Sequence, residues 1–198
     1  MFIVFEGIDG SGKDTIINKI SHWLAEQNVA HITTFEPGNV LGGNVRNIIK
    51  EHKKLDVEAE TLLFLADRKE HIEHVVKPAL KLGLWVLQNR YMLSTVAYQG
   101  AKGMSVDTIY ELFDKFILLK PNICFLLDVP AEVAYQRIRR RGSKIDKFEN
   151  ITYLTIVRKL YLKYAQDWNC KIVDATQRPD DVYKEIRGVL FPLLDDMN

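Results

Sequence analysis

A short apolar run at residues 2–5 leads directly into a glycine-rich loop, and a helical pattern begins at Lys13. The spacing of Gly7, Gly12 and Lys13 is that of a phosphate-binding P-loop, in which backbone N–H groups, a helix N-terminus and a lysine converge on phosphate oxygens. Strand, loop and helix occur in the order that such a loop requires. The alternative is a glycine-rich turn without a ligand. This feature predicts a nucleotide-binding α/β chain.

The rest of the chain alternates short apolar runs with longer stretches of helical period, which indicates a parallel sheet covered by helices on both faces. Five strands with the apolar character of doubly buried strands are predicted, at 2–5, 30–34, 84–88, 123–127 and 171–173. Helices are predicted over 13–27, 40–53, 57–82, 106–119, 131–141, 150–167 and 180–191, with N-caps at Asp56, Ser105, Asn150 and Asp180. No repeat or linker divides the chain, so we expect a single domain over 1–198. The expected architecture is the three-layer sandwich of P-loop NTPases.

The charge balance gives no reason to expect a nucleic-acid or membrane partner, because 27 Lys and Arg against 26 Asp and Glu leave a net charge of +1. No apolar stretch approaches the roughly 18 residues that cross a bilayer, and Glu6 interrupts the apolar N-terminus. We therefore expect a cytoplasmic protein. Cys124 and Cys170 lie in or beside apolar runs, and we expect packing residues rather than a disulfide framework.

Five segments together resemble the thymidylate kinase family, and they run in family order along the whole chain. They are FEGIDGSGKDT from residue 5, FEPG at 35–38, LLFLADR at 62–68, NRYMLSTVAYQG at 89–100 and LLDVPAEVAYQRIRRRG at 126–142. The resemblance implies transfer of the γ-phosphoryl group of ATP to dTMP with Mg²⁺, by a homodimer. Two alternatives stay open: a kinase of another nucleoside monophosphate, and a nucleotide-binding regulatory protein with little turnover.

The resemblance assigns the donor site and the catalytic cations. The residues implied to bind ATP are Gly7, Ile8, Asp9, Gly10, Ser11, Gly12, Lys13, Asp14 and Thr15. Lys13 and Arg90 would act in catalysis, with Arg90 bridging the transferred and acceptor phosphates, as a planar guanidinium can. Arg46 matches a family arginine that holds the 5′-phosphate of the acceptor.

The acceptor base and sugar are assigned in the same way. Phe64 and Arg68, four residues apart on one helix face, would stack on the pyrimidine and donate to its 4-oxo oxygen. A cytosine would present a donor there and leave the arginine unpaired. The remaining residues implied to bind the substrate are Thr95 and Gln99 at the base, Tyr98 where a ribose 2′-OH would lie, and Asp9 and Glu36 beside the sugar.

A basic segment at 137–147 resembles the LID of the family, which closes over ATP and excludes water. We expect this LID at about 138–149. Some family members carry an arginine where this chain has Gly10, and others supply the cation from the LID. Arg141, Lys144 and Lys147 are the candidates here, and Arg141 and Lys147 are predicted to be catalytic.

Two positions depart from the family. Asp14 stands where the P-loop has a Ser or Thr that offers its hydroxyl to Mg²⁺, and Asn89 replaces the aspartate of the Asp-Arg motif. The formal charge around the metal is unchanged by the pair of exchanges. We therefore predict that Asp14 is a metal ligand and that the two changes compensate each other. The alternative is that both reduce activity.

Overall fold

The computed structural model describes residues 1–38, 44–52, 55–140 and 151–197. Its centre is a five-stranded sheet in the order β2-β3-β1-β4-β5, and every pair of neighbours is parallel. The strands are β1 (Phe2–Glu6), β2 (His31–Phe35), β3 (Trp85–Asn89), β4 (Ile123–Asp128) and β5 (Cys170–Asp174). All five predicted strands are confirmed, with ends displaced by one residue at most.

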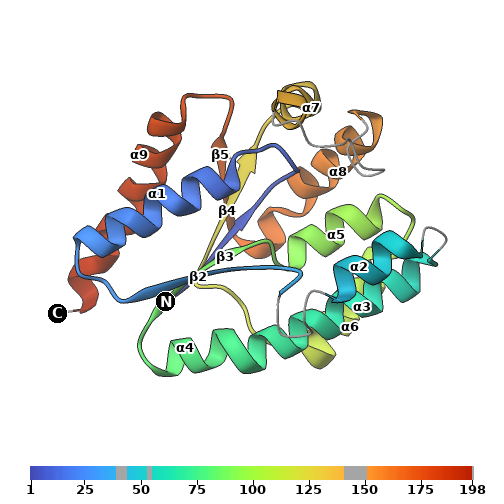
Figure 1. Ribbon diagram of the computed structural model, residues 1–198, viewed down its shortest axis with the longest axis horizontal. Coiled ribbons are helices and arrows are strands. Elements are labelled where there is room, and N and C mark those ends of the chain that lie inside the picture. Colours follow the sequence, from blue (N-terminus) through green and yellow to red (C-terminus); the bar gives the residue numbers. More distant parts are fainter. Residues whose placement is uncertain (39–43, 53–54, 141–150, 198) are drawn as a thin grey trace.

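Helices cover both faces of the sheet, as the alternating pattern predicted (Figure 1). They are α1 (Lys13–Glu26), α2 (Asn44–Glu51), α3 (Val57–His71), α4 (Lys77–Lys81), α5 (Met92–Gly100), α6 (Val106–Phe116), α7 (Ala131–Arg140), α8 (Ile151–Tyr164) and α9 (Pro179–Leu190). A π-helical turn, Ile72–Val76, joins α3 to α4, and short 3₁₀ turns occur at Gln166–Trp168 and Phe191–Met197. Helices α1 and α9 pack together, and α3, α5, α6 and α8 lie on the opposite side of the sheet (Figure 1).

The sequence pattern missed α5, because this short helix is buried on nearly all sides and shows no amphipathic stripe. The caps at Asp56 and Ser105 are confirmed, since each side chain accepts a hydrogen bond from a backbone N–H of the first turn. The cap at Asp180 is wrong: α9 begins at Pro179, whose fixed φ suits a first helical position, and Asp180 lies inside the first turn. Asn150 and part of the expected helix 40–53 lie outside the described residues.

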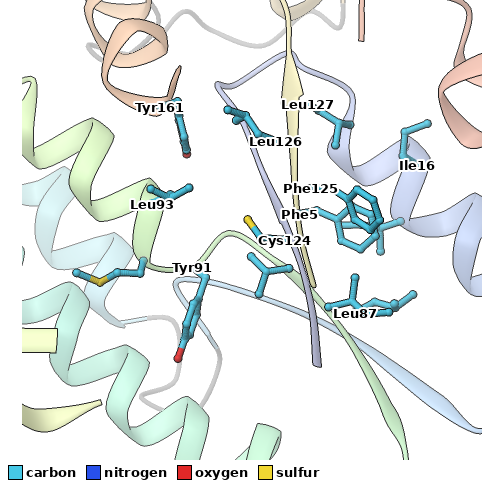
Figure 2. Close-up of a cluster of buried hydrophobic side chains, with 14 of the residues drawn as sticks. Phe5, Ile16, Leu87, Tyr91, Leu93, Cys124, Phe125, Leu126, Leu127 and Tyr161 are labelled. Atoms are coloured by element: carbon cyan, nitrogen blue, oxygen red, sulfur yellow. The ribbon is translucent and has the colours of Figure 1, made fainter. Parts of the chain in front are cut away.

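The hydrophobic core fills both sides of the sheet. The rings of Phe5 and Phe125 stack at 5.6 Å on the side of α1, whereas Tyr91 and Tyr161 lie on the other side (Figure 2). Central strands β1, β3 and β4 are buried on both faces, as expected. Strands β2 and β5 are partly exposed, because they form the two edges of the sheet. No described helix is long and apolar enough to cross a membrane.

Cys124 and Cys170 form a disulfide, so the expectation that they serve only as packing residues is wrong. They are direct partners in the register of β4 and β5, with Cα atoms 4.4 Å apart. That separation falls within the range a disulfide can bridge. Their separation of 46 positions in the sequence hides the pairing.

Candidate active site

The carboxyl ends of β1 and β3 converge on one edge of the sheet, which is where ligands bind in such folds. The P-loop leaves β1 there, and Lys13 opens α1. The Lys13 ammonium is buried and donates to the carbonyl oxygens of Gly7 at 2.7 Å and Ile8 at 3.0 Å. Burial and the nearby Arg90 lower the pKa of Lys13 from 10.5 to about 7. A bound phosphate would add negative charge beside this ammonium and favour its charged form.

Gly10 is required by both its backbone and its surroundings. Its φ is +81°, and a Cβ built there would lie 2.4 Å from the carbonyl oxygen of Ala134 on α7. An arginine at this position, as found in part of the family, therefore does not fit unless α7 moves. The supply of a cation from the LID stays a prediction, because Arg141, Lys144 and Lys147 lie outside the described residues.

A cavity of about 300 Å³ lies beside the P-loop. Its lining residues are Ser11, Gly12, Thr15, Ile16, Arg137, Ala175, Gln177, Pro179 and Val182. Sequence reasoning missed the contribution of the segment after β5, because nothing in its residues marks a binding site. Arg137 of α7 donates to the carbonyl oxygen of Ala175 at 2.9 Å, and so joins two walls of the cavity.

Arg90 follows β3 directly and has a φ of +68°, unusual for a residue with a side chain. Its Nη2 lies 2.6 Å from Oδ1 of Asp9, and its Nη1 donates to Ser94 and Tyr161 at 3.2 and 3.3 Å. Its guanidinium also stacks on the ring of Tyr98, 4.9 Å from the centroid. Four contacts from three elements thus fix the guanidinium beside the P-loop.

Asp9 and Tyr98 form a reciprocal pair beneath Arg90. The hydroxyl of Tyr98 accepts from the backbone N–H of Asp9 at 3.0 Å and donates to its Oδ2 at 3.1 Å. Burial opposes ionisation of Asp9, but Arg90 and Lys13 outweigh it and lower its pKa from 3.8 to about 2. Asp9 therefore stays ionised throughout the physiological pH range.

Glu6 is a buried carboxylate that sequence reasoning did not assign to the site. It accepts hydrogen bonds from the backbone N–H groups of Tyr91 and Ser94 and from the hydroxyls of Ser94 and Tyr161. Burial raises its pKa. Because both hydroxyls also contact Arg90, Glu6 holds the partners of that arginine. Its place at the end of an apolar strand was the only signal in the sequence.

Two of the predicted base-binding residues, Arg68 and Thr95, are in contact between α3 and α5. Arg68 is only 3% exposed, and it donates to Oε2 of Glu36 at 2.6 Å and to Oγ1 of Thr95 at 3.0 Å. Phe64 lies one turn earlier on α3 and is half-buried. Gln99 is buried one turn after Thr95, and its amide donates to Glu60. Glu60 was not predicted.

A second layer supports Glu36. The ring of His71 lies behind it, with Nδ1 3.6 Å from Oε1 of Glu36 and Nε2 2.6 Å from Oγ1 of Thr34. Asp67 accepts the backbone N–H of Gly38 at 2.6 Å and so fastens the loop after β2 to α3. These contacts hold Glu36 and the loop after β2 against α3.

The two residues that depart from the family are in direct contact. Nδ2 of Asn89 donates to Oδ1 of Asp14 at 2.6 Å, across 75 residues of sequence. Oδ1 of Asn89 is buried and has no hydrogen-bond partner among the described residues. No group of three or more His, Cys, Asp or Glu side chains suited to a metal occurs in the described part of the chain. A metal here would take few protein ligands, as Mg²⁺ does beside phosphates.

One predicted residue is not brought into this arrangement. Arg46 lies on α2 with an exposed side chain, and no hydrogen bond or ion pair joins it to another described residue. Arg141 and Lys147 lie outside the described residues, as does most of the expected LID.

The fold and the site define the class of P-loop phosphotransferases. Comparison with known proteins specifies the family. The sequence profile described as "Thymidylate kinase" matches residues 5–186. The chain is 39% identical over 196 residues to the thymidylate kinase of Carboxydothermus hydrogenoformans, covering 96% of each chain. It is 37% identical over 208 residues to a probable thymidylate kinase of Thermococcus kodakarensis, covering 99% of this chain and all of the relative.

A third relative, the thymidylate kinase of Brachyspira hyodysenteriae, is 39% identical over 188 residues, with 95% of this chain and 92% of the relative covered. The chain therefore belongs to the thymidylate kinase family, and it is a nucleoside monophosphate kinase.

Proposed function

We propose that this chain phosphorylates dTMP to dTDP, with ATP as the donor and Mg²⁺ as the metal. The observation that carries the proposal is the position of Arg90, which Asp9 of the P-loop and Ser94 and Tyr98 of α5 hold between them. Phosphoryl transfer needs two anionic substrates aligned and their charge neutralised, and a held guanidinium between two sites does both.

The donor nucleotide occupies the P-loop. The backbone N–H groups from Gly7 to Thr15 and the ammonium of Lys13 bind its phosphates, and the adjoining cavity accepts its adenine. Lys13 gives up its bonds to two carbonyl oxygens in exchange for phosphate oxygens. Arg141 or Lys147 of the LID adds a further cation and helps to exclude water.

The acceptor lies between Arg90 and α3. Arg90 binds the transferred and acceptor phosphates, and Arg46 binds the 5′-phosphate. Asp9 accepts the 3′-OH, Glu36 borders the sugar, and Tyr98 fills the space of a ribose 2′-OH. At the base, Phe64 stacks on the pyrimidine, Arg68 donates to the 4-oxo group, and Thr95 and Gln99 bind the edge.

Asp14 suits a hard divalent cation, because its exposed carboxylate is an oxygen donor of the type that Mg²⁺ prefers. The amide oxygen of Asn89 is buried, so Asn89 acts through its amide nitrogen. When bound, Mg²⁺ neutralises phosphate charge during the transfer. Asp14 holds the metal, and Asn89 orients Asp14 through the 2.6 Å hydrogen bond.

The proposal extends to assembly and location. The protein acts as a homodimer in the cytoplasm and as a single domain, without a nucleic-acid or membrane partner. The resemblance to the family supports the dimer, and the near-neutral net charge supports the absence of a polyanionic partner.

A coupled assay of ADP release tests the activity, with ATP, Mg²⁺ and, separately, dTMP, dUMP, dGMP, UMP, CMP and AMP. We expect fast turnover with a preference for dTMP. Preference for another acceptor would overturn the assignment of the base pocket. Binding of dTMP without turnover would favour the regulatory alternative.

A further inference from the structure

Two polar contacts join the facing sides of α3 and α5, and along α3 they lie one turn before and one turn after Phe64. Glu60, Phe64 and Arg68 recur every four residues and so share one face of α3. Thr95 and Gln99 share one face of α5 in the same way. One contact joins Arg68 to Thr95 at 3.0 Å, and the other joins Glu60 to Gln99 at 3.2 Å. The family roles carried over from the sequence use four of these residues and leave Glu60 without a function.

Glu60 is buried, with 5% exposure, and its charge is held by a cation. The ammonium of Lys102 contacts both of its carboxylate oxygens, at 2.7 Å for Oε2. An ammonium has only donors to offer, so both carboxylate oxygens of Glu60 act as acceptors in this contact.

This chemistry decides which way the amide of Gln99 points. Facing an obligate acceptor, Gln99 must turn its Nε2 toward Glu60, as the 3.2 Å contact records. Its Oε1 therefore faces away from Glu60, and no described residue donates a hydrogen bond to that oxygen. A side chain that is 3% exposed thus keeps one acceptor available.

We propose that Glu60 is a positioning residue for base selection, which fixes Gln99 as an acceptor for the N3–H of the pyrimidine. The inference rests on the proposed function, since it places the base beside Gln99. A 2,4-dioxo pyrimidine carries a proton on N3, whereas cytosine presents a lone pair there. The fixed Oε1 of Gln99 would oppose that lone pair, and this adds a second point of rejection to the one at Arg68.

The test is Glu60→Gln, measured by competition of dCMP against dTMP. A neutral amide at residue 60 can both donate and accept, so Gln99 can turn its Nε2 toward the base. We expect the inhibition constant of dCMP to fall about tenfold, because an opposed pair of buried acceptors is relieved. The KM for dTMP should change by about twofold at most, since the original orientation stays available, and the KM for ATP should not change.

Glu58→Gln is the matched control, because Glu58 is an exposed acid on the same helix. It should leave all three constants unchanged. In a Gln99→Leu background, Glu60→Gln should no longer alter dCMP binding. A purely structural role for Glu60 would weaken dTMP and dCMP together, and would overturn the proposal.

The outcomes separate this inference from the proposed function. If the wild-type enzyme phosphorylates dTMP and Glu60→Gln leaves dCMP inhibition unchanged, the positioning role is refuted and the activity stands. If the wild-type enzyme prefers a different acceptor, the base-binding residues have been assigned wrongly. Both the positioning role and the proposed function are then refuted.

Discussion

Replacement of Asp14 by serine should impair this enzyme, although the P-loop of the family has a serine or threonine at this position. The reason is the 2.6 Å hydrogen bond from Asn89 to Asp14. Asp14→Ser removes the carboxylate and leaves the amide of Asn89 facing a short hydroxyl. Asn89→Asp alone places a second carboxylate against the first. The double variant recreates a hydroxyl beside a carboxylate.

The magnitudes follow from that contact. A hydrogen bond to a charged group contributes about 1.5 to 3 kcal/mol, so Asp14→Ser should lower kcat/KM by roughly 10- to 150-fold. Two carboxylates about 3 Å apart repel by ~1.4 kcal/mol in bulk water and ~5.5 kcal/mol at an effective dielectric of 20. Asn89→Asp alone should therefore lower kcat/KM by at least about tenfold. The double variant should return to within about tenfold of the wild type, a coupling of at least ~1.5 kcal/mol.

The assay is kcat/KM for dTMP in all four proteins, together with calorimetric binding of a non-hydrolysable ATP analogue at several Mg²⁺ concentrations. Wild type and double variant should bind the analogue far better with Mg²⁺, whereas Asp14→Ser should lose most of that dependence. Losses that add in the double variant would refute the compensation, and would indicate two independent defects.

Three further changes test the geometry. Arg68→Met should lower the free energy of unfolding by about 3 to 5 kcal/mol in urea titrations, because it leaves the buried carboxylate of Glu36 unpaired; a loss below about 1 kcal/mol would contradict this. Gly10→Ala should cost about 2 kcal/mol and raise the KM for ATP, since its Cβ would meet the carbonyl of Ala134 at a positive φ; an unchanged melting temperature would refute it. The pKa of Lys13 is about 7 without ligand, and phosphate favours the ammonium form, so ATP binding at pH 8 should take up a proton. Calorimetry in two buffers of different ionisation enthalpy measures this uptake, which Lys13→Met should abolish.

The sequence predicted the fold well because short apolar runs alternate along the chain with longer stretches of helical period. It failed where local signals were weak. Helix α5 is buried nearly all round, and its buried residues include Ser94, Thr95 and Gln99, so it has no apolar stripe to detect. The pairing of Cys124 with Cys170 depends on which strands become neighbours, and the order β4-β5 is a property of the whole sheet.

The residues of the site also divide into those that the sequence could predict and those that it could not. Residues next to the P-loop and after β3 could be predicted, because parallel strands bring their carboxyl ends to one edge. Glu6, Glu60 and His71 could not, since each acts on another side chain rather than on a substrate. Their contacts join residues far apart in sequence, such as Glu6 and Tyr161, and a single sequence carries no trace of such distances.

The side chains assigned to substrate binding already have hydrogen-bond partners within the protein, and this affects how specificity arises. Lys13 bonds to carbonyl oxygens, Arg90 to Asp9, Arg68 to Glu36, and Gln99 to Glu60. A substrate must replace or share these partners, so the number of hydrogen bonds changes little and the net gain from each is small. A wrong base, in contrast, leaves a buried group unpaired and bears the full desolvation penalty. Selection in this pocket should therefore come mainly from rejection of misfits, and the residues that orient donors and acceptors should matter as much as those that touch the base.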